Sequence, residues 1–195
     1  TEYEKNKGRG FFYQYLSSGK GHGPFTELLD GSVKYDLIGG IGPNLLGHSH
    51  PLYIKAHLEA ATSDTVMCGN LLSYRGPLDL TSEILSKVKN SRLKHFWFSG
   101  SGSFANDSAL KMIWQKKAPH YKIIAFNQAF AGRSVATRDI TFNPAYREGM
   151  PKTIDVSHVP HFNSKDPEGS IKATIGELNT LCNKSPGEYA GIMIE

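Results

Sequence analysis

The sequence is poor in the features that mark secreted, membrane-spanning and nucleic-acid-binding proteins. Among its 195 residues are two cysteines, Cys68 and Cys182, whose separation fits no metal-binding or redox motif. We expect both to be free, buried thiols in a reducing compartment. No apolar run approaches the roughly 20 residues that cross a bilayer, and the polar first residues contain no apolar signal region. The formal charge of +4 is mild, and the basic residues are scattered. We therefore expect a cytoplasmic protein that binds neither membranes nor nucleic acid.

The composition that remains is that of an ordinary globular protein. Hydrophobic residues make up 39% of the chain and aromatic residues 11%. The length suits one domain or a piece of a larger one, with enough residues for a sizeable core.

The most informative stretch begins with an aromatic, strand-like segment at residues 93–98. Five residues that are only Gly or Ser follow, and then apolar residues recur at helical spacing over 104–117. A strand, a tight turn and a helix start would point free backbone N–H groups at one spot, and the hydroxyls of Ser101 and Ser103 add donors. This pattern favours a phosphate site. The simpler alternative is a helix capped by Ser103.

Two nucleotide-binding motifs fit this turn less well. A P-loop is excluded because no Gly-Lys-Ser/Thr follows the glycines. A dinucleotide fingerprint is matched loosely by Gly100, Gly102 and Ala105. That motif expects an acid at the end of the next strand, but the strand at 122–126 is followed by Asn127 and Gln128. A nicotinamide site is therefore the second choice.

A more detailed match is to a known enzyme family. Residues 101–111 resemble the Ser-Gly-Thr-Glu-Ala-Asn-Glu-x-Ala-x-Lys segment of class III (ornithine/acetylornithine-type) aminotransferases. These enzymes use pyridoxal 5′-phosphate (PLP), and in the family this turn binds the phosphate of the cofactor. The resemblance implies that Ser101, Gly102 and Ser103 bind the cofactor.

A second segment agrees with this family in order and spacing. Residues 25–38 form two alternating runs around Asp30 and Gly31, which predicts a hairpin. Residues 39–51 then resemble the family's Gly-Ile-x-x-x-x-Leu-Gly-His-x-His-Pro signature. His48 and His50 could be two ligands of a metal site, but no third ligand lies nearby in the sequence. We therefore expect these residues to cap the following helix and to bind no metal.

A third segment, residues 127–137, resembles the family's Ala-Phe-His-Gly-Arg-Thr-x-x-Ala-Thr motif. In the family, the aromatic residue of this motif stacks on the pyridine ring of PLP, and the Arg commonly binds a substrate carboxylate. The resemblance implies that Phe130 binds the cofactor and Arg133 binds the substrate. Both roles are chemically reasonable, since a flat ring covers a flat cofactor and a guanidinium fork matches a carboxylate. The alternatives are a core aromatic and a surface salt bridge.

The predicted fold class is α/β, corresponding to the N-terminal part of PLP-dependent fold type I. We expect residues 1–60 to form an arm and small-domain elements, with a weakly ordered arm over 1–24, and residues 61–195 to begin the large PLP-binding domain. Further elements are expected as helices at 52–61, 76–88 and 169–182, strands at 121–126, 153–159 and 190–195, and loops at 65–75 and 138–152.

The resemblance also shows what the chain lacks. The family's Schiff-base Lys and the acid that protonates the pyridine nitrogen lie beyond the position of Glu195, so no catalytic residue is assigned. We expect the chain to be the N-terminal portion of a longer protein and to be inactive alone. Phe104 and Ala131 replace the usual acid and His near the cofactor, which puts the reaction type in doubt.

The implied function is amino-group transfer between an amino donor and a carbonyl acceptor in a homodimer. The same fold also serves aminomutases and decarboxylases, and a non-catalytic, aminotransferase-like interaction protein fits the departures at Phe104 and Ala131.

Overall fold

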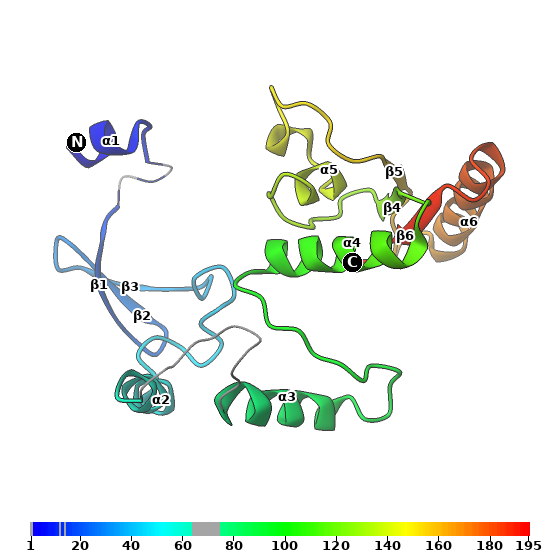
Figure 1. The fold of residues 1–195 in the computed structure, drawn as a ribbon. Coiled ribbons are helices and arrows are strands. Elements are labelled where there is room, and N and C mark those ends of the chain that lie inside the picture. Colours follow the sequence, from blue (N-terminus) through cyan, green and yellow to red (C-terminus); the bar gives the residue numbers. More distant parts are fainter. Residues whose placement is uncertain (1, 12, 14, 64–74) are drawn as a thin grey trace. The chain divides into compact units, whose positions relative to one another are not determined.

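The computed structural model describes all residues except 1, 12, 14 and 64–74. Its contacts divide the chain into two units, one ending at Leu80 and the other beginning at Thr81. Figure 1 shows the elements in chain order, and each unit is described by itself. The loop predicted at 65–75 lies outside the described residues apart from Arg75, and Cys68 lies outside them as well.

The first unit is built on a small antiparallel sheet with the order β1-β2-β3, formed by residues 17–22, 25–28 and 33–35. The predicted hairpin is confirmed, because Phe25 lies opposite Tyr35 in the pairing of β2 with β3. Gly31 adopts the positive φ of 81° that this turn requires. The described elements of this unit are α1 (Glu2–Lys7), β1 (Ser17–His22), β2 (Phe25–Leu28), β3 (Val33–Tyr35), α2 (Pro51–Ala61) and the start of α3 (Arg75–Lys87).

The weakly ordered arm predicted over residues 1–24 is wrong for much of its length. Residues 17–22 form β1, which pairs with β2 and adds a third strand to the hairpin. Residues 2–7 form the short helix α1, with acidic residues in its first turn and basic residues in its last, as the helix dipole favours. Residues 2–7 and 17–22 contain almost no apolar side chains, so hydrophobic periodicity could predict neither the helix nor the strand.

His48 and His50, considered above as possible metal ligands, have separate structural roles. A hydrogen bond of 2.8 Å joins His48 Nε2 to Asp36, whose carboxylate also accepts from the N–H groups of residues 38–40. These hydrogen bonds lower the pKa of Asp36, and the one from His48 has the largest effect. His50 instead caps α2 by accepting a hydrogen bond from Leu52 N, and Pro51 is the first residue of the helix. Among the described residues, no group of three or more His, Cys, Asp or Glu is arranged to hold a metal.

The second unit contains a parallel sheet in which β4 is central. The strand order is β5-β4-β6, with Ile124 opposite Ser157 on one side and Ile192 on the other. β4 lies between β5 and β6 (Figure 1), and its middle residues 123–125 are buried. The described elements that follow α3 are α4 (Gly102–Lys117), β4 (Lys122–Phe126), α5 (Thr137–Ile140), the 3-10 turn η1 (Pro144–Tyr146), β5 (Val156–Val159), α6 (Pro167–Lys184) and β6 (Tyr189–Ile192).

This arrangement confirms the predicted α/β class, since parallel strands are connected through helices. α4 packs against β6 and α6 against β5. The core groups Leu110 of α4 with Ile123 and Ala125 of β4, Ile140 of α5 and Ala190 of β6. None of the described helices is both long and apolar enough to cross a membrane.

Three predictions for this unit are wrong. Residues 93–98 are not a strand, since among the described residues they pair with no strand of the sheet β5-β4-β6. The polar loop predicted at 138–152 instead contains part of α5 and all of η1, and its first residues are buried. Cys182 is exposed on α6 rather than buried.

The core predicts a clear difference between two positions on α4. Leu110 is 1% exposed and packs under the sheet, whereas Met112 is 53% exposed. Leu110→Ala should lower the free energy of unfolding by about 2–5 kcal/mol, because truncation leaves a cavity that the core fills poorly. Met112→Ala should change it by less than about 1 kcal/mol, and urea unfolding monitored by circular dichroism measures both. Equal losses would contradict this packing.

Candidate functional site

The Gly/Ser turn lies at the N-terminus of α4, and its backbone is accessible to an anion. Ser101 is the N-cap residue, and its hydroxyl accepts a hydrogen bond of 3.3 Å from Phe104 N. An added Cβ at Gly100 or Gly102 would meet nothing within 4 Å, so the backbone here is open. The first N–H groups of a helix have no partner within the helix, and the helix dipole adds positive potential. The turn therefore fits a phosphate group.

The simpler expectation, that Ser103 caps the helix, is wrong because Ser101 takes that role. Ser103 lies in the first turn of α4, and its hydroxyl accepts from the N–H of Arg133 at 3.4 Å. A Cβ added at Gly132 would lie 2.3 Å from Ser103 Oγ. The predicted phosphate turn and the predicted Phe130–Arg133 segment are thus in direct contact.

The loop that carries Phe130 leaves the carboxyl end of β4. Its path is fixed from α4, because Asn106 Nδ2 donates to the carbonyl of Ala131 at 2.7 Å. Phe130 itself is half exposed, at 50%, and its N–H donates to the carboxylate of Glu195. An exposed apolar ring held on a fixed backbone is suited to cover a flat ligand.

A hollow of about 150 Å³ lies beside this ring. It is lined by Asn106, residues 129–131 and residues 193–195, so it lies where β4 and β6 end. In α/β folds with parallel strands, ligands bind outside the carboxyl ends of the strands. Of the predicted site residues, Phe130 lines this hollow, and its loop contacts Ser103 through Gly132 and Arg133.

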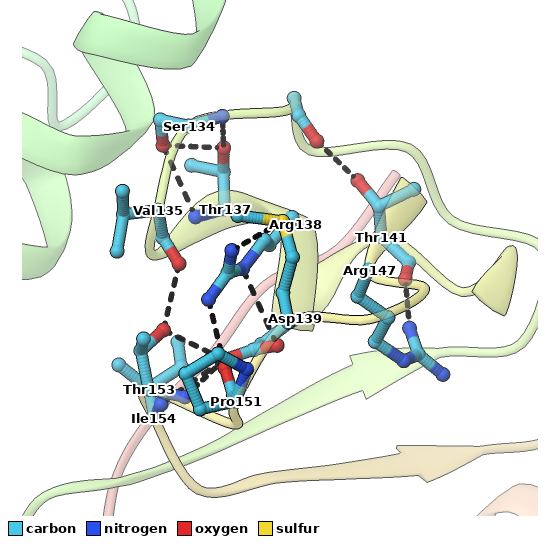
Figure 2. Close-up of polar contacts among 12 residues, drawn as sticks. Ser134, Val135, Thr137, Arg138, Asp139, Thr141, Arg147, Pro151, Thr153 and Ile154 are labelled. Carbon is cyan, nitrogen blue, oxygen red and sulfur yellow. Dashed lines mark hydrogen bonds and ion pairs between the residues drawn. The ribbon is translucent and has the colours of Figure 1, made fainter. Parts of the chain in front are cut away.

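Behind this loop lies a group of buried polar side chains that the sequence did not predict (Figure 2). Thr137, Arg138, Asp139 and Thr141 are each at most 6% exposed. Asp139 accepts hydrogen bonds from the N–H and hydroxyl of Thr153, both at 2.7 Å. Buried polar groups are stable only when they are paired in this way.

The neighbouring arginine joins the same segments. Arg138 donates to the carbonyl of Pro151 at 2.8 Å, and its Nε lies 4.0 Å from Asp139 Oδ1. Together, Arg138 and Asp139 fasten α5 to residues 150–154. Burial raises the pKa of Asp139, but the hydrogen bonds from Thr153 and Ile154 and the charge of Arg138 outweigh it, so the pKa is lowered.

Thr141 connects this buried group to the loop of Phe130. Its hydroxyl accepts from Ala131 N at 3.0 Å and donates to the carbonyl of Gly132 at 2.8 Å. Ser134 makes a similar connection to α4, because its hydroxyl donates to Asp107 at 2.8 Å. These contacts hold the loop from both sides.

Tyr146 is a further residue beside the site that sequence reasoning missed. Its ring centroid lies 5.8 Å from that of Phe130, with an interplanar angle of 73°, and 5.8 Å from Arg133 Cζ. The residue was assigned to a polar loop. The available signal was Asn143 followed by Pro144, a pair that favours the start of a turn, and Asn143 does cap η1.

The two departures from the family motif fall in different environments. Phe104 is 62% exposed in the first turn of α4, where it contributes no charge. Ala131 is buried and belongs to the core cluster beneath the loop. Neither disturbs the turn or the loop that brings Ser103 next to Gly132.

The similarity to solved structures defines the class of fold. The taurine:2-oxoglutarate aminotransferase from Bifidobacterium kashiwanohense matches with a TM-score of 0.83 at 15% identity, over 98% of this chain and 46% of that one. The ornithine aminotransferase from Toxoplasma gondii matches with a TM-score of 0.78 at 18% identity, over 99% of this chain and 43% of that one. At these identities the likeness shows the fold, which is that of PLP-dependent transferases of fold type I.

Sequence comparison identifies the family. A family model described as aminotransferase class-III matches residues 9–195. An acetylornithine aminotransferase from Vibrio vulnificus is 32% identical over 148 residues, covering 73% of this chain, and one from Shewanella oneidensis is 29% identical over 182 residues, covering 90%. The chain belongs to the class-III aminotransferase family. It spans 36% and 43%, respectively, of the length of these two curated relatives.

The contact between loop and turn predicts that Gly132 tolerates no side chain. Its φ of 125° is unfavourable for other residues, and a Cβ would also lie 2.8 Å from Thr137 Oγ1. Gly132→Ala should cost more than about 2 kcal/mol in free energy of unfolding. Gly149→Ala is the matched control, because Gly149 has a φ of 69° with nothing within 4 Å, and should cost about 1–2 kcal/mol. Equal losses in urea unfolding would show that the close contact is absent.

Asp139 predicts a pH-dependent contribution to stability. Because its folded-state pKa lies below the ordinary value of 3.8, it stabilises the fold above that pH, and the contribution is lost as pH falls through the lowered pKa. The difference in unfolding free energy between the native chain and Asp139→Asn should be constant from pH 7 to 5 and shrink below about pH 4. Urea titrations at several pH values measure it. A difference that stays constant down to pH 2.5 would contradict the assignment.

Proposed function

We propose that the whole protein is a PLP-dependent aminotransferase that moves an amino group between an amino donor and a carbonyl acceptor. The observation that carries this proposal is the contact between an open Gly/Ser turn at a helix N-terminus and a loop that presents a half-exposed Phe130. Family membership supplies the reaction class. PLP, when bound, supplies an electron sink that withdraws charge from the substrate's α-carbon.

The roles of the individual residues follow from their positions. Ser101, Gly102 and Ser103 bind the phosphate of PLP, because their N–H groups and hydroxyls lie at the positive end of α4. Phe130 covers one face of the pyridine ring and excludes water from it. Arg133, exposed on the same loop, binds a substrate carboxylate.

The organisation of the whole protein is part of the same proposal. We assign residues 1–60 to the N-terminal arm and small domain and residues 61–195 to the first part of the PLP-binding domain. A homodimer in the cytoplasm with small-molecule substrates is the assembly that the family resemblance implies. The curated relatives described above are named acetylornithine aminotransferases, and an amino acid donor with an oxo-acid acceptor is the corresponding substrate pair.

The proposal predicts that Phe130 contributes directly to cofactor affinity. In the full-length protein, Phe130→Leu should weaken PLP binding about tenfold, the effect of losing about 1.4 kcal/mol of ring contact. Tyr121→Leu is the matched control, since Tyr121 is 51% exposed just before β4, at the opposite end of that strand from the loop of Phe130, and its PLP affinity should match that of the unchanged protein. PLP absorbance titration gives the dissociation constants.

Three results would contradict the proposal. A full-length protein that binds NAD but not PLP would restore the dinucleotide alternative. A protein that binds PLP without transferring amino groups would be a non-catalytic relative or another enzyme of this fold. Equal PLP affinities for Phe130→Leu and the unchanged protein would remove Phe130 from the site.

A further inference from the structure

We propose that Tyr146 is a positioning residue that orients the Arg133 guanidinium for a substrate carboxylate. This inference rests on the proposed function, in which Arg133 is the carboxylate-binding residue. It concerns a side chain to which neither the sequence motifs nor the comparisons give a role.

The first observation is the environment of the Arg133 guanidinium. Among the residues that the structure describes, Arg133 has no ion pair, and its Cζ lies 5.8 Å from the centre of the Tyr146 ring. This distance is within the range of a cation–π contact. A guanidinium that rests on an aromatic face keeps its in-plane N–H donors free, and these are the donors that bind a carboxylate in a bidentate manner.

The second observation is that the position of Tyr146 is fixed by the backbone. Asn143 caps η1, with its side chain accepting from Ala145 N at 3.0 Å. The guanidinium of Arg147, the next residue, donates to the carbonyl of buried Thr141 at 2.7 Å, as Figure 2 shows. At the other end of this segment, Phe142 N donates to the carbonyl of Ala129 at 2.9 Å. The ring is therefore tied to the same framework as Phe130 and Arg133.

The third observation is that Tyr146 contacts both predicted site residues. Its ring meets Phe130 at an interplanar angle of 73° and lies next to the guanidinium of Arg133. A free arginine side chain loses considerable rotamer freedom when it binds a ligand. A ring that already limits this freedom reduces the loss, so Tyr146 should raise the affinity for a carboxylate without touching it.

The test uses the full-length protein and a probe that carries carboxylates but no amino group. Glutarate is the probe, and glutaramide, its uncharged analogue, is the control ligand; isothermal titration calorimetry gives the dissociation constants. Tyr146→Leu should weaken glutarate binding about two- to fivefold, the effect expected for an exposed cation–π contact. Tyr146→Phe should bind as the unchanged protein does, because it keeps the ring.

Two further measurements separate positioning from a general structural effect. In an Arg133→Ala background, Tyr146→Leu should cause no additional loss of glutarate binding. With a carboxylate-bearing amino donor, Tyr146→Leu should raise KM and leave kcat within about twofold. Tyr121→Leu is the matched control, since Tyr121 is 51% exposed just before β4, and should leave both constants unchanged.

The outcomes distinguish this inference from the function on which it rests. If Arg133→Ala abolishes glutarate binding but Tyr146→Leu has no effect, the role of Tyr146 is wrong and the proposed function stands. Equal losses from Tyr146→Leu in both backgrounds would also overturn it, because they would show a structural role. If Arg133→Ala binds glutarate as the unchanged protein does, the assignment of Arg133 fails and the inference fails with it.

Discussion

The arrangement of the site depends on one buried hydroxyl, that of Thr141. It accepts from the N–H of Ala131 and donates to the carbonyl of Gly132, which are backbone groups of adjacent residues in the loop after β4. Because the hydroxyl is buried, water cannot replace either hydrogen bond, and leaving one unmade would cost the desolvation of a backbone group. The loop is thereby held in the conformation that places Gly132 against Ser103. The orientation of the exposed side chains follows from a contact below the surface.

This constraint explains why a polar group is buried behind an otherwise ordinary α/β sheet. The core of Leu110, Ile123 and Ala125 fixes α4 relative to the strands but gives no direction to the segment after β4. Directional bonds are needed there, and the hydroxyls of Thr137 and Thr141 supply them to residues 131–134. Arg138 and Asp139 in turn fasten α5 to residues 150–154. Hydrophobic packing positions the elements, and the buried polar side chains position the loop between them.

The sequence predicted the parts of the fold whose signals are local. Helical spacing located α4 and α6, and the pair Asp30 and Gly31 located the hairpin. It failed where the outcome depends on distant residues. Residues 93–98 have strand composition but no described partner, and the charged side chains of Arg138 and Asp139 indicate solvent unless their hydrogen-bond partners at 150–154 are known. For the site, motif resemblance brought Ser103 and Arg133 into consideration, and the structure shows them in contact. Tyr146 could not be found this way, because its position follows from tertiary bonds.

The unpaired aromatic segment ahead of the Gly/Ser turn has a consequence for handling the polypeptide. Trp97 is 66% exposed and Phe98 46%, on extended backbone that joins no sheet among the described residues. Segments of this kind readily form intermolecular β-structure, because another chain can satisfy their N–H and C=O groups while covering the rings. This segment should therefore promote self-association of the polypeptide, to a greater extent as its concentration rises.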